Sequence, residues 1–216
     1  MSPELMMWFM LATKMAVTAL FVTAATIIAE RLGAMVGALV ATLPVSAGPV
    51  YVFLALDHDS TFISSSAVVS LALNSATAIY LTAYVLIAQR HSMWLSISLA
   101  FVMWLAAVLM LSPVQWTAGS ASALNLIVFT ACIVIVQPFC LVRIPPTTRP
   151  WYDFVLRAGF VLANAVPALA GFGVALLTLH LAAVPLGSRA ALIIALGVSV
   201  VWNALVYAIR RRQALA

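Results

Sequence analysis

The sequence consists mostly of runs of about twenty or more apolar residues, separated by short polar or proline-bearing breaks. A helix needs about 20 mainly apolar residues to cross the hydrocarbon core of a bilayer. The runs are continuous and do not alternate with polar positions, which favours helices over the strands of a barrel. Only 7% of the residues are charged, against about 25% in an ordinary soluble domain. This excludes a soluble enzyme, a disordered chain and a nucleic-acid-binding module.

Hydropathy along the chain predicts an all-α, polytopic transmembrane helix bundle, with residues 1–216 forming a single integral membrane domain. We expect seven spans, at residues 6–29, 33–56, 62–88, 93–111, 120–142, 154–181 and 190–209. The breaks are too short for an extramembrane domain. The N-terminus, Met-Ser-Pro-Glu, has no basic region, so the first run is expected to be a retained span and not a cleaved signal peptide.

Basic residues fall mainly on one side of the predicted membrane. When the sides alternate along the chain, the residues on that side are Arg31, Arg90, Arg143, Arg149, Arg157, Arg210, Arg211 and Arg212. The other side carries only Arg189, with Lys14 a turn or two inside the first span. Because cytoplasmic loops are rich in Lys and Arg, we expect the N-terminus outside and the C-terminus in the cytoplasm. The net charge of +5 then reflects topology and indicates no acidic partner or nucleic acid.

Lys14 and the middle of the second span are not explained by topology. A cation inside a bilayer is costly, so Lys14 either extends its side chain to the headgroups or faces a cavity where it binds an anion or pairs with an acid. In the second span, Pro44 and Pro49 flank Ser46 and Gly48. Two prolines remove helix hydrogen bonds, and this pattern is typical of the discontinuous helices of transporters. The alternative is a kinked but otherwise ordinary membrane helix.

Amide side chains are scattered over the later spans. They are Asn74, Asn125, Gln137, Asn164 and Asn203. Hydrogen bonding between helices is the plain account of each one. Asn164 stands close before Pro167, where a polar side chain can bind a carbonyl that the proline leaves free, and we expect this span to be irregular.

Two further polar features have a functional and a structural interpretation. Asp57-His58-Asp59 offers metal-ligating side chains, but Ser60-Thr61 follows, and we favour a solvated loop in which these two residues cap the next helix. His180 lies late in its span, where we expect an isolated interfacial histidine. The alternative role for His180 is a titrating group in a proton-coupled cycle.

A weak internal repeat relates two proline-containing segments. Residues 41–46 resemble residues 182–187, and each proline follows a basic residue near the start of a span by about 30 positions. The two spans that carry these basic residues would run in opposite directions, as in an inverted repeat, a common transporter plan. Against this, Pro185 falls at a span end whereas Pro44 falls in mid-span.

The first half of the chain resembles the small GlpM-type inner-membrane proteins of bacteria. The resemblance rests on Lys14, Glu30-Arg31, Gly33, Gly37, Pro44, Pro49 and His58, followed by two further spans to Leu111. The chain is longer than those proteins by about three spans. The resemblance implies a bacterial inner-membrane location and no particular activity or site residue.

These features favour a small-solute transporter or permease with a midplane site at the broken second helix. We expect the pathway to include Lys14, Pro44, Ser46, Gly48 and Asn74, with Asn164 opposite. No nucleotide-binding loop is present, and we expect no cofactor, no metal and no enzymatic activity. The contacts considered are the bilayer, a small solute and, in a homo-oligomer, a second copy of the chain. One alternative is a non-transporting subunit or assembly factor of a membrane complex. A third is a membrane enzyme acting on lipid, for which only residues 57–59 offer a catalytic group.

Overall fold

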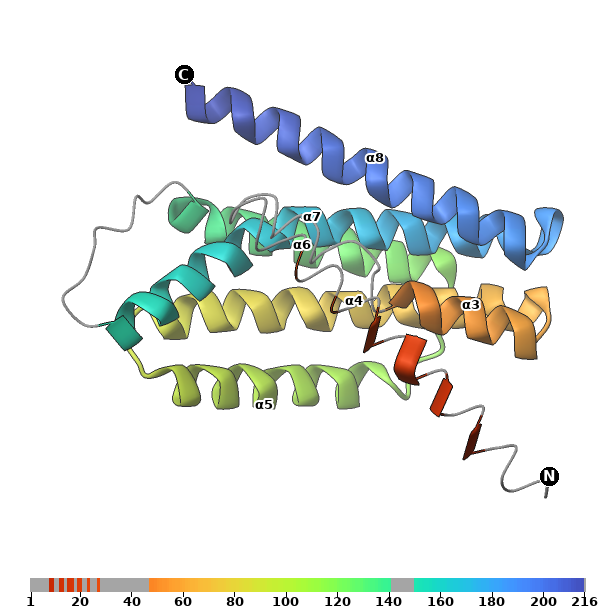
Figure 1. The fold of residues 1–216 in the computed structure, drawn as a ribbon, viewed down its shortest axis with the longest axis horizontal. Coiled ribbons are helices and arrows are strands. Elements are labelled where there is room, and N and C mark those ends of the chain that lie inside the picture. Colours follow the sequence, from red (N-terminus) through yellow and green to blue (C-terminus); the bar gives the residue numbers. More distant parts are fainter. Residues whose placement is uncertain are drawn as a thin grey trace.

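The computed structural model describes residues 8–9, 12–13, 15–17, 19–20, 23, 27, 47–140 and 150–215. Its side chains are described over 50–139, 165–209 and at isolated positions outside these ranges. The elements of the described segments are all helices: α3 (Ala47–Asp57), α4 (Ser60–Ala88), α5 (Met93–Leu111), α6 (Ala118–Cys140), α7 (Pro150–Leu186) and α8 (Ser188–Leu215). Figure 1 shows them as one bundle of roughly aligned helices, with α8 crossing the others at a slant.

Helices α4 to α8 correspond to the last five predicted spans. Each of these helices contains a segment long and apolar enough to cross a membrane. At about 1.5 Å per residue, the 29 residues of α4 extend for about 43 Å, which exceeds the hydrocarbon core of a bilayer. The all-helical class is therefore confirmed for the described residues, and five of their helices have the length and composition of membrane spans. Only scattered residues of the first predicted span are described, and the second span before Ala47 lies outside the described residues, so the count of seven stays a prediction.

Local sequence sets the start of α4 and the turn between α7 and α8. The Asp59 side chain accepts a hydrogen bond from the Phe62 N–H at 3.0 Å, so Asp59 caps α4, and the expectation that Ser60-Thr61 would do so is wrong. An aspartate oxygen satisfies an N–H group that has no partner within the helix. Gly187 separates α7 from α8 with φ +80°, a backbone conformation that glycine adopts at no steric cost.

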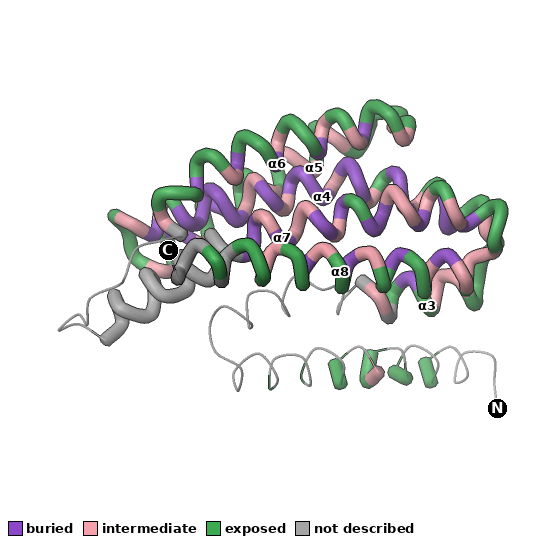
Figure 2. Tube along the Cα trace, turned by 90° about the horizontal axis from the view of Figure 1, so that it is seen from above, coloured by how far each residue is buried: buried purple, intermediate pink, exposed green. Residues whose placement is uncertain are grey.

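Helix α4 lies at the centre of the bundle. It contacts α3, α5, α6 and α7, while α7 contacts α4, α6 and α8. In Figure 1, α4 lies between α5 and α7, and Figure 2 shows buried residues along the length of α4. The largest fully buried side chains come from α4, α6 and α7: Ile63, Leu71, Val85, Val136, Val166 and Leu176. The core is thus the seam between α4 and the α6–α7 pair.

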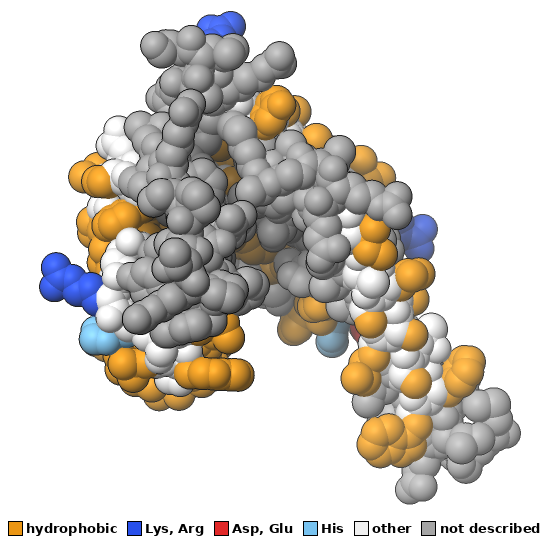
Figure 3. All heavy atoms as spheres, turned by 60° about the vertical axis from the view of Figure 1, so that its left-hand side comes forward, with side chains coloured by type: hydrophobic (Ala, Val, Ile, Leu, Met, Phe, Trp, Pro, Cys, Tyr) orange, Lys and Arg blue, Asp and Glu red, His pale blue; other side chains and the backbone are white. Residues whose placement is uncertain are grey.

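The outer helices expose apolar side chains. Within its most apolar segment, α5 buries 11% of its residues, against 67% for α4. The exposed side chains of α5 include Trp94, Phe101, Met103, Leu109 and Met110. Hydrophobic side chains also make up much of the described surface visible in Figure 3. Exposure on this scale in water would be a strong aggregation hazard, whereas it is the ordinary surface of a protein in contact with lipid.

Helix α7 continues through its prolines. It runs from Pro150 to Leu186 with Pro167 and Pro185 inside it, so the expected irregularity of this span is not a break. The helix instead changes direction in its N-terminal half (Figure 1). A proline removes one hydrogen bond and pushes its ring against the preceding turn, which bends a helix without unwinding it.

Candidate functional site

Two buried amides meet near the middle of α4. Asn74 Nδ2 donates to Asn125 Oδ1 of α6 at 3.2 Å and to the Leu169 carbonyl of α7 at 3.4 Å. Asn125 Nδ2 donates in turn to the Leu71 carbonyl and, at 3.0 Å, to Ser75 Oγ. Both side chains are buried. This amide cluster therefore joins three helices through hydrogen bonds that are shielded from solvent.

Gly173 makes room for the amide cluster on α7. A Cβ atom at this position would lie 2.9 Å from Asn125 Oδ1 and 3.2 Å from Asn74 Nδ2. Real Cβ atoms essentially never come as close as the first of these distances, and the second is also tight, so a side chain here would displace the Asn125 amide. The glycine is required by this close approach and not by its backbone angle.

A second polar contact joins α4 to α7 closer to the end of the bundle. Ser64 Oγ donates to the His180 carbonyl at 3.0 Å. His180 Nδ1 lies 2.8 Å from Ser64 Oγ and 3.0 Å from the Ser64 carbonyl. All three contacts are satisfied when Nδ1 carries the proton and donates, a tautomer that we assign from the hydrogen bonds. His180 is therefore not the isolated histidine that we expected.

Helix α3 contacts the same part of α4 through a tyrosine. The Tyr51 hydroxyl lies 2.8 Å from Ser70 Oγ and 3.2 Å from the Ser66 carbonyl, and the ring is buried. Tyr51 also belongs to the apolar cluster formed with Leu71 and Leu176. Its ring thus packs in the core while its hydroxyl is satisfied on α4, as buried tyrosines require.

The polar residues of α4 that make these contacts share one side of the helix. They are Ser60, Ser64, Ser70, Asn74 and Ser75, and we call them the α4 polar face. At 3.6 residues per turn they fall within an arc of about 140°. From Ser60 to Ser75 they extend for about 22 Å at 1.5 Å per residue, from one end of α4 to its middle.

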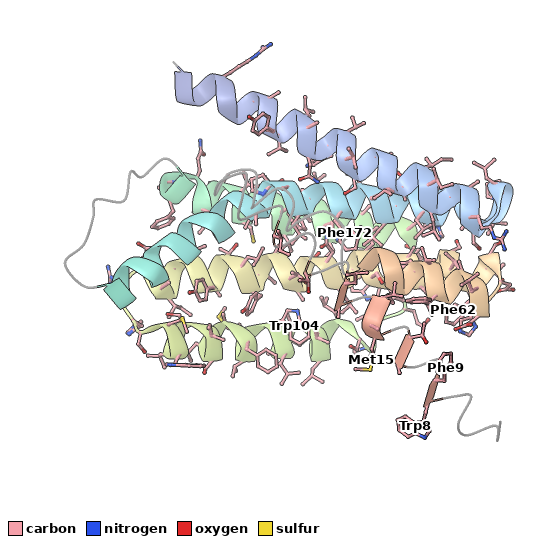
Figure 4. The ribbon with its side chains drawn as sticks, viewed as in Figure 1. Trp8, Phe9, Met15, Phe62, Trp104 and Phe172 are labelled. Carbon is pink, nitrogen blue, oxygen red and sulfur yellow. The ribbon has the colours of Figure 1, made fainter. Side chains whose placement is uncertain are left out.

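An open pocket lies at the Ser60 end of the polar face, where the α3–α4 and α7–α8 connections meet. We call it the end pocket. It has a volume of about 420 Å³ and is lined by Ala55, His58, Asp59, Ser60, Leu186, Gly187, Ser188 and Arg189. The hydroxyls of Ser60 and Ser188 lie 3.4 Å apart across it. The His58 ring stacks on Phe62 at 4.0 Å between centroids, and Figure 4 shows Phe62 at this end of the bundle.

Hydrogen bonds from Thr61 Oγ1, at 2.6 Å, and from the Phe62 N–H hold the pKa of Asp59 below its usual value of 3.8. A depressed pKa means that the ionised carboxylate stabilises the folded state. That contribution is present above the unfolded pKa and is lost as the pH falls through the folded value. We therefore expect Asp59→Asn, which keeps a capping oxygen, to reduce the loss of thermal stability between pH 6 and about pH 3. Melting temperatures in detergent measure this, and an unchanged pH dependence would contradict it.

The structure brings together only part of the predicted site. Asn74 lies in the amide cluster. Gly48 is half-buried in the first turn of α3, and no described atom would lie within 4 Å of a Cβ there. Asn164 is on α7, but its side chain lies outside the described residues, as do Lys14, Pro44 and Ser46 altogether. The first segment of the proposed inverted repeat is also outside them.

Several contacts at the site had no clear signal in the sequence. Asn125 was recognised as a buried amide, but its pairing with Asn74 depends on how α4 and α6 pack. Ser64, Tyr51 and Ser70 are common residues in membrane helices. In the described part of the chain, no group of three His, Cys, Asp or Glu side chains is arranged to hold a metal ion. This includes the Asp57-His58-Asp59 segment.

Comparison of the chain with models of known protein families, with curated proteins and with solved structures finds no match. The resemblance to GlpM-type proteins therefore stays a prediction, and the function has to be argued from the described residues.

Proposed function

We propose that the chain is a small-solute membrane transporter whose pathway follows the α4 polar face from the end pocket to the amide cluster. The observation that carries the proposal is that this face makes polar contacts with α8, α7, α3 and α6 in turn. Polar groups inside a membrane are costly and commonly mark a substrate route. Hydrogen bonding between helices accounts for any single pair, but less readily for a series leading from a pocket to mid-membrane.

The mechanism that fits this arrangement is movement of one helix group against another around a midplane site. Separation of α4 from α7 would exchange the contacts at Ser64 and Asn74 for contacts with a polar solute or water. Those hydrogen bonds are each worth about 1 kcal/mol net, so the exchange requires little energy. Lys14, Pro44, Ser46, Gly48 and Asn164 are the further residues that we propose near this route, on the basis of the sequence.

The proposed setting is the inner membrane of a bacterium, with the N-terminus outside. In this orientation the end pocket opens to the outer side, because the second, fourth and sixth inter-span connections lie there. The chain would draw energy from an ion gradient or a partner subunit. Membership of the GlpM-type family is part of the same proposal.

The second candidate is a non-transporting subunit of a membrane complex. It is favoured by α5, which contacts α4 and leaves most of its apolar surface exposed. Either lipid or a helix of a partner protein would cover that surface. Stable co-purification of a second protein, together with no solute flux by the purified chain, would favour this candidate.

Substitution of Asn74 tests the pathway. We expect Asn74→Ala to lower the initial rate of solute flux in proteoliposomes by about tenfold, since one lost polar contact to the solute costs about 1.4 kcal/mol. Gln137→Ala is the matched control, because Gln137 is an exposed amide on α6. Rates are normalised to the folded protein by thermal melts. Equal flux in wild type and Asn74→Ala would remove Asn74 from the pathway. Normal flux in both Lys14→Ala and Ser46→Ala would remove the part of the site that was assigned from the sequence.

A further inference from the structure

Arg189 is an exception to the distribution of the other basic residues. The other arginines of the described segments, at position 90 in the α4–α5 turn, 157 in α7 and 210–212 in α8, lie toward the opposite end of the bundle. The distribution of basic residues that predicts orientation therefore does not account for Arg189. In the described part of the chain, its side chain is exposed and makes no hydrogen bond or ion pair. It lines the end pocket.

The start of α8 adds backbone donors beside Arg189. The first N–H groups of a helix have no partner within it, and the positive end of the helix dipole attracts an anion. The first turn of α8 contains no acidic residue to satisfy them. At α4, by contrast, the Asp59 side chain already accepts a hydrogen bond from one of the corresponding groups, the Phe62 N–H. The α8 side of the end pocket is therefore suited to an oxyanion, which a guanidinium binds through two parallel hydrogen bonds.

The α4 side of the pocket carries the opposite charge. Asp59 accepts one hydrogen bond on each carboxylate oxygen, from the Phe62 N–H and the Thr61 hydroxyl. A carboxylate has about four acceptor positions, so two remain for a cation. Asp59 is ionised at neutral pH, since its pKa lies below the usual value of 3.8. A volume of about 420 Å³ is within the range of small-molecule sites.

We propose that the end pocket binds a small zwitterion, its oxyanion held by Arg189 and the start of α8 and its ammonium group by Asp59. The Ser60 and Ser188 hydroxyls line the same pocket and supply neutral hydrogen bonds to the ligand. A free solute and the headgroup of a phosphatidylethanolamine share this chemistry. Binding at the pocket goes beyond the proposed transport and is measured without it, so either proposal can fail alone.

Titration of the purified chain with phosphoethanolamine in a non-ionic detergent tests the proposal. Calorimetry should show binding that weakens by at least tenfold in Arg189→Gln and in Asp59→Asn, since each removes a charged hydrogen-bonding group. Asp59→Asn keeps the oxygen that caps the helix, so its loss of affinity reports the carboxylate and not the loss of the cap. Arg212→Gln, an exposed arginine at the other end, should bind like wild type. Glycerol 3-phosphate and ethanolamine, which each lack one charge, should bind more weakly than phosphoethanolamine.

The source of the ligand is identified by a second arm in nanodiscs. If the melting temperature is higher in phosphatidylethanolamine than in phosphatidylglycerol, and this difference is lost in Arg189→Gln, the ligand is the lipid headgroup. If only free phosphoethanolamine binds, the ligand is a solute. Arg189→Lys, which keeps the charge, replaces Arg189→Gln if the latter does not fold, with an intermediate affinity expected. No binding in either arm, or binding unchanged by both charge-removing substitutions, would overturn the proposal. Equal affinity for glycerol 3-phosphate and phosphoethanolamine would show that the pocket does not recognise the ammonium group, and would overturn the assignment of a zwitterionic ligand.

Discussion

Replacing Gly171 with alanine is expected to lower the free energy of unfolding by about 3 kcal/mol. The added Cβ would lie 2.1 Å from Trp202 Cδ1, 2.3 Å from its Cγ and 2.8 Å from its Cβ. A change of side-chain rotamer could move Cγ and Cδ1, but the indole is packed between the helices and Cβ stays in place while the two backbones keep their positions. Helices α7 and α8 would have to separate, and the hydrogen bond from Trp202 Nε1 to the Pro167 carbonyl at 3.0 Å would be lost.

Thermal or chemical unfolding in detergent measures this effect. Gly197→Ala is the matched control, because Gly197 is exposed on α8 and no described atom lies within 4 Å of its added Cβ. It should be neutral or slightly stabilising, since alanine is the better helix former by up to about 1 kcal/mol. In a Trp202→Ala background the overlaps with Cγ and Cδ1 are absent and only the 2.8 Å approach to the retained Cβ remains, so Gly171→Ala should cost less there. Additive effects of the two substitutions would show that this contact does not hold α7 against α8.

Asn125→Asp is expected to cost about 3 kcal/mol or more although the side chain keeps its size. Asn125 Nδ2 donates to the Leu71 carbonyl, to Ser75 Oγ at 3.0 Å and to the Ala121 carbonyl at 3.4 Å. A carboxylate has no donor to replace these bonds and would place a negative charge among carbonyl oxygens. A protonated acid avoids the charge but supplies one donor in place of two.

The melting temperature of Asn125→Asp should therefore rise toward that of wild type as the pH is lowered, because the neutral acid is the less costly form. Gln137→Glu makes the same chemical change at an exposed position of α6 and should alter stability little. Asn125→Leu separates the two contributions, because it removes the hydrogen bonds without adding charge and should be less destabilising than Asn125→Asp. Similar stability for Asn125→Asp and wild type would show that the amide cluster is open to water.

Helix positions could be predicted from the sequence because a helix that crosses a bilayer needs an apolar run long enough to match the thickness of the hydrocarbon core. The predicted span 93–111 coincides with α5, and the other described spans differ from their helices mainly at the ends. Some of those differences come from local chemistry. The cap of α4 is the Asp59 carboxylate and not the neighbouring Ser60 or Thr61, a choice that rests on side-chain geometry.

Partners between helices could not be predicted in the same way. A buried amide signals that some hydrogen bond exists, but the pairing of Asn74 with Asn125 is set by how α4 and α6 pack. The sequence likewise contained no indication that Trp202 fills the space beside Gly171. Periodicity along one helix carries no information about the neighbour it faces.

Solute flux by the purified wild-type chain tests the central claim most directly. Proteoliposomes are mixed with glycine, phosphoethanolamine or glycerol in separate concentration steps, and vesicle volume is followed by light scattering. The transporter proposal predicts entry of at least one solute faster than in protein-free liposomes, with the rate reduced about tenfold in Asn74→Ala and unchanged in Gln137→Ala. Entry at the protein-free rate for every solute, under an imposed proton gradient as well as without one, would contradict it.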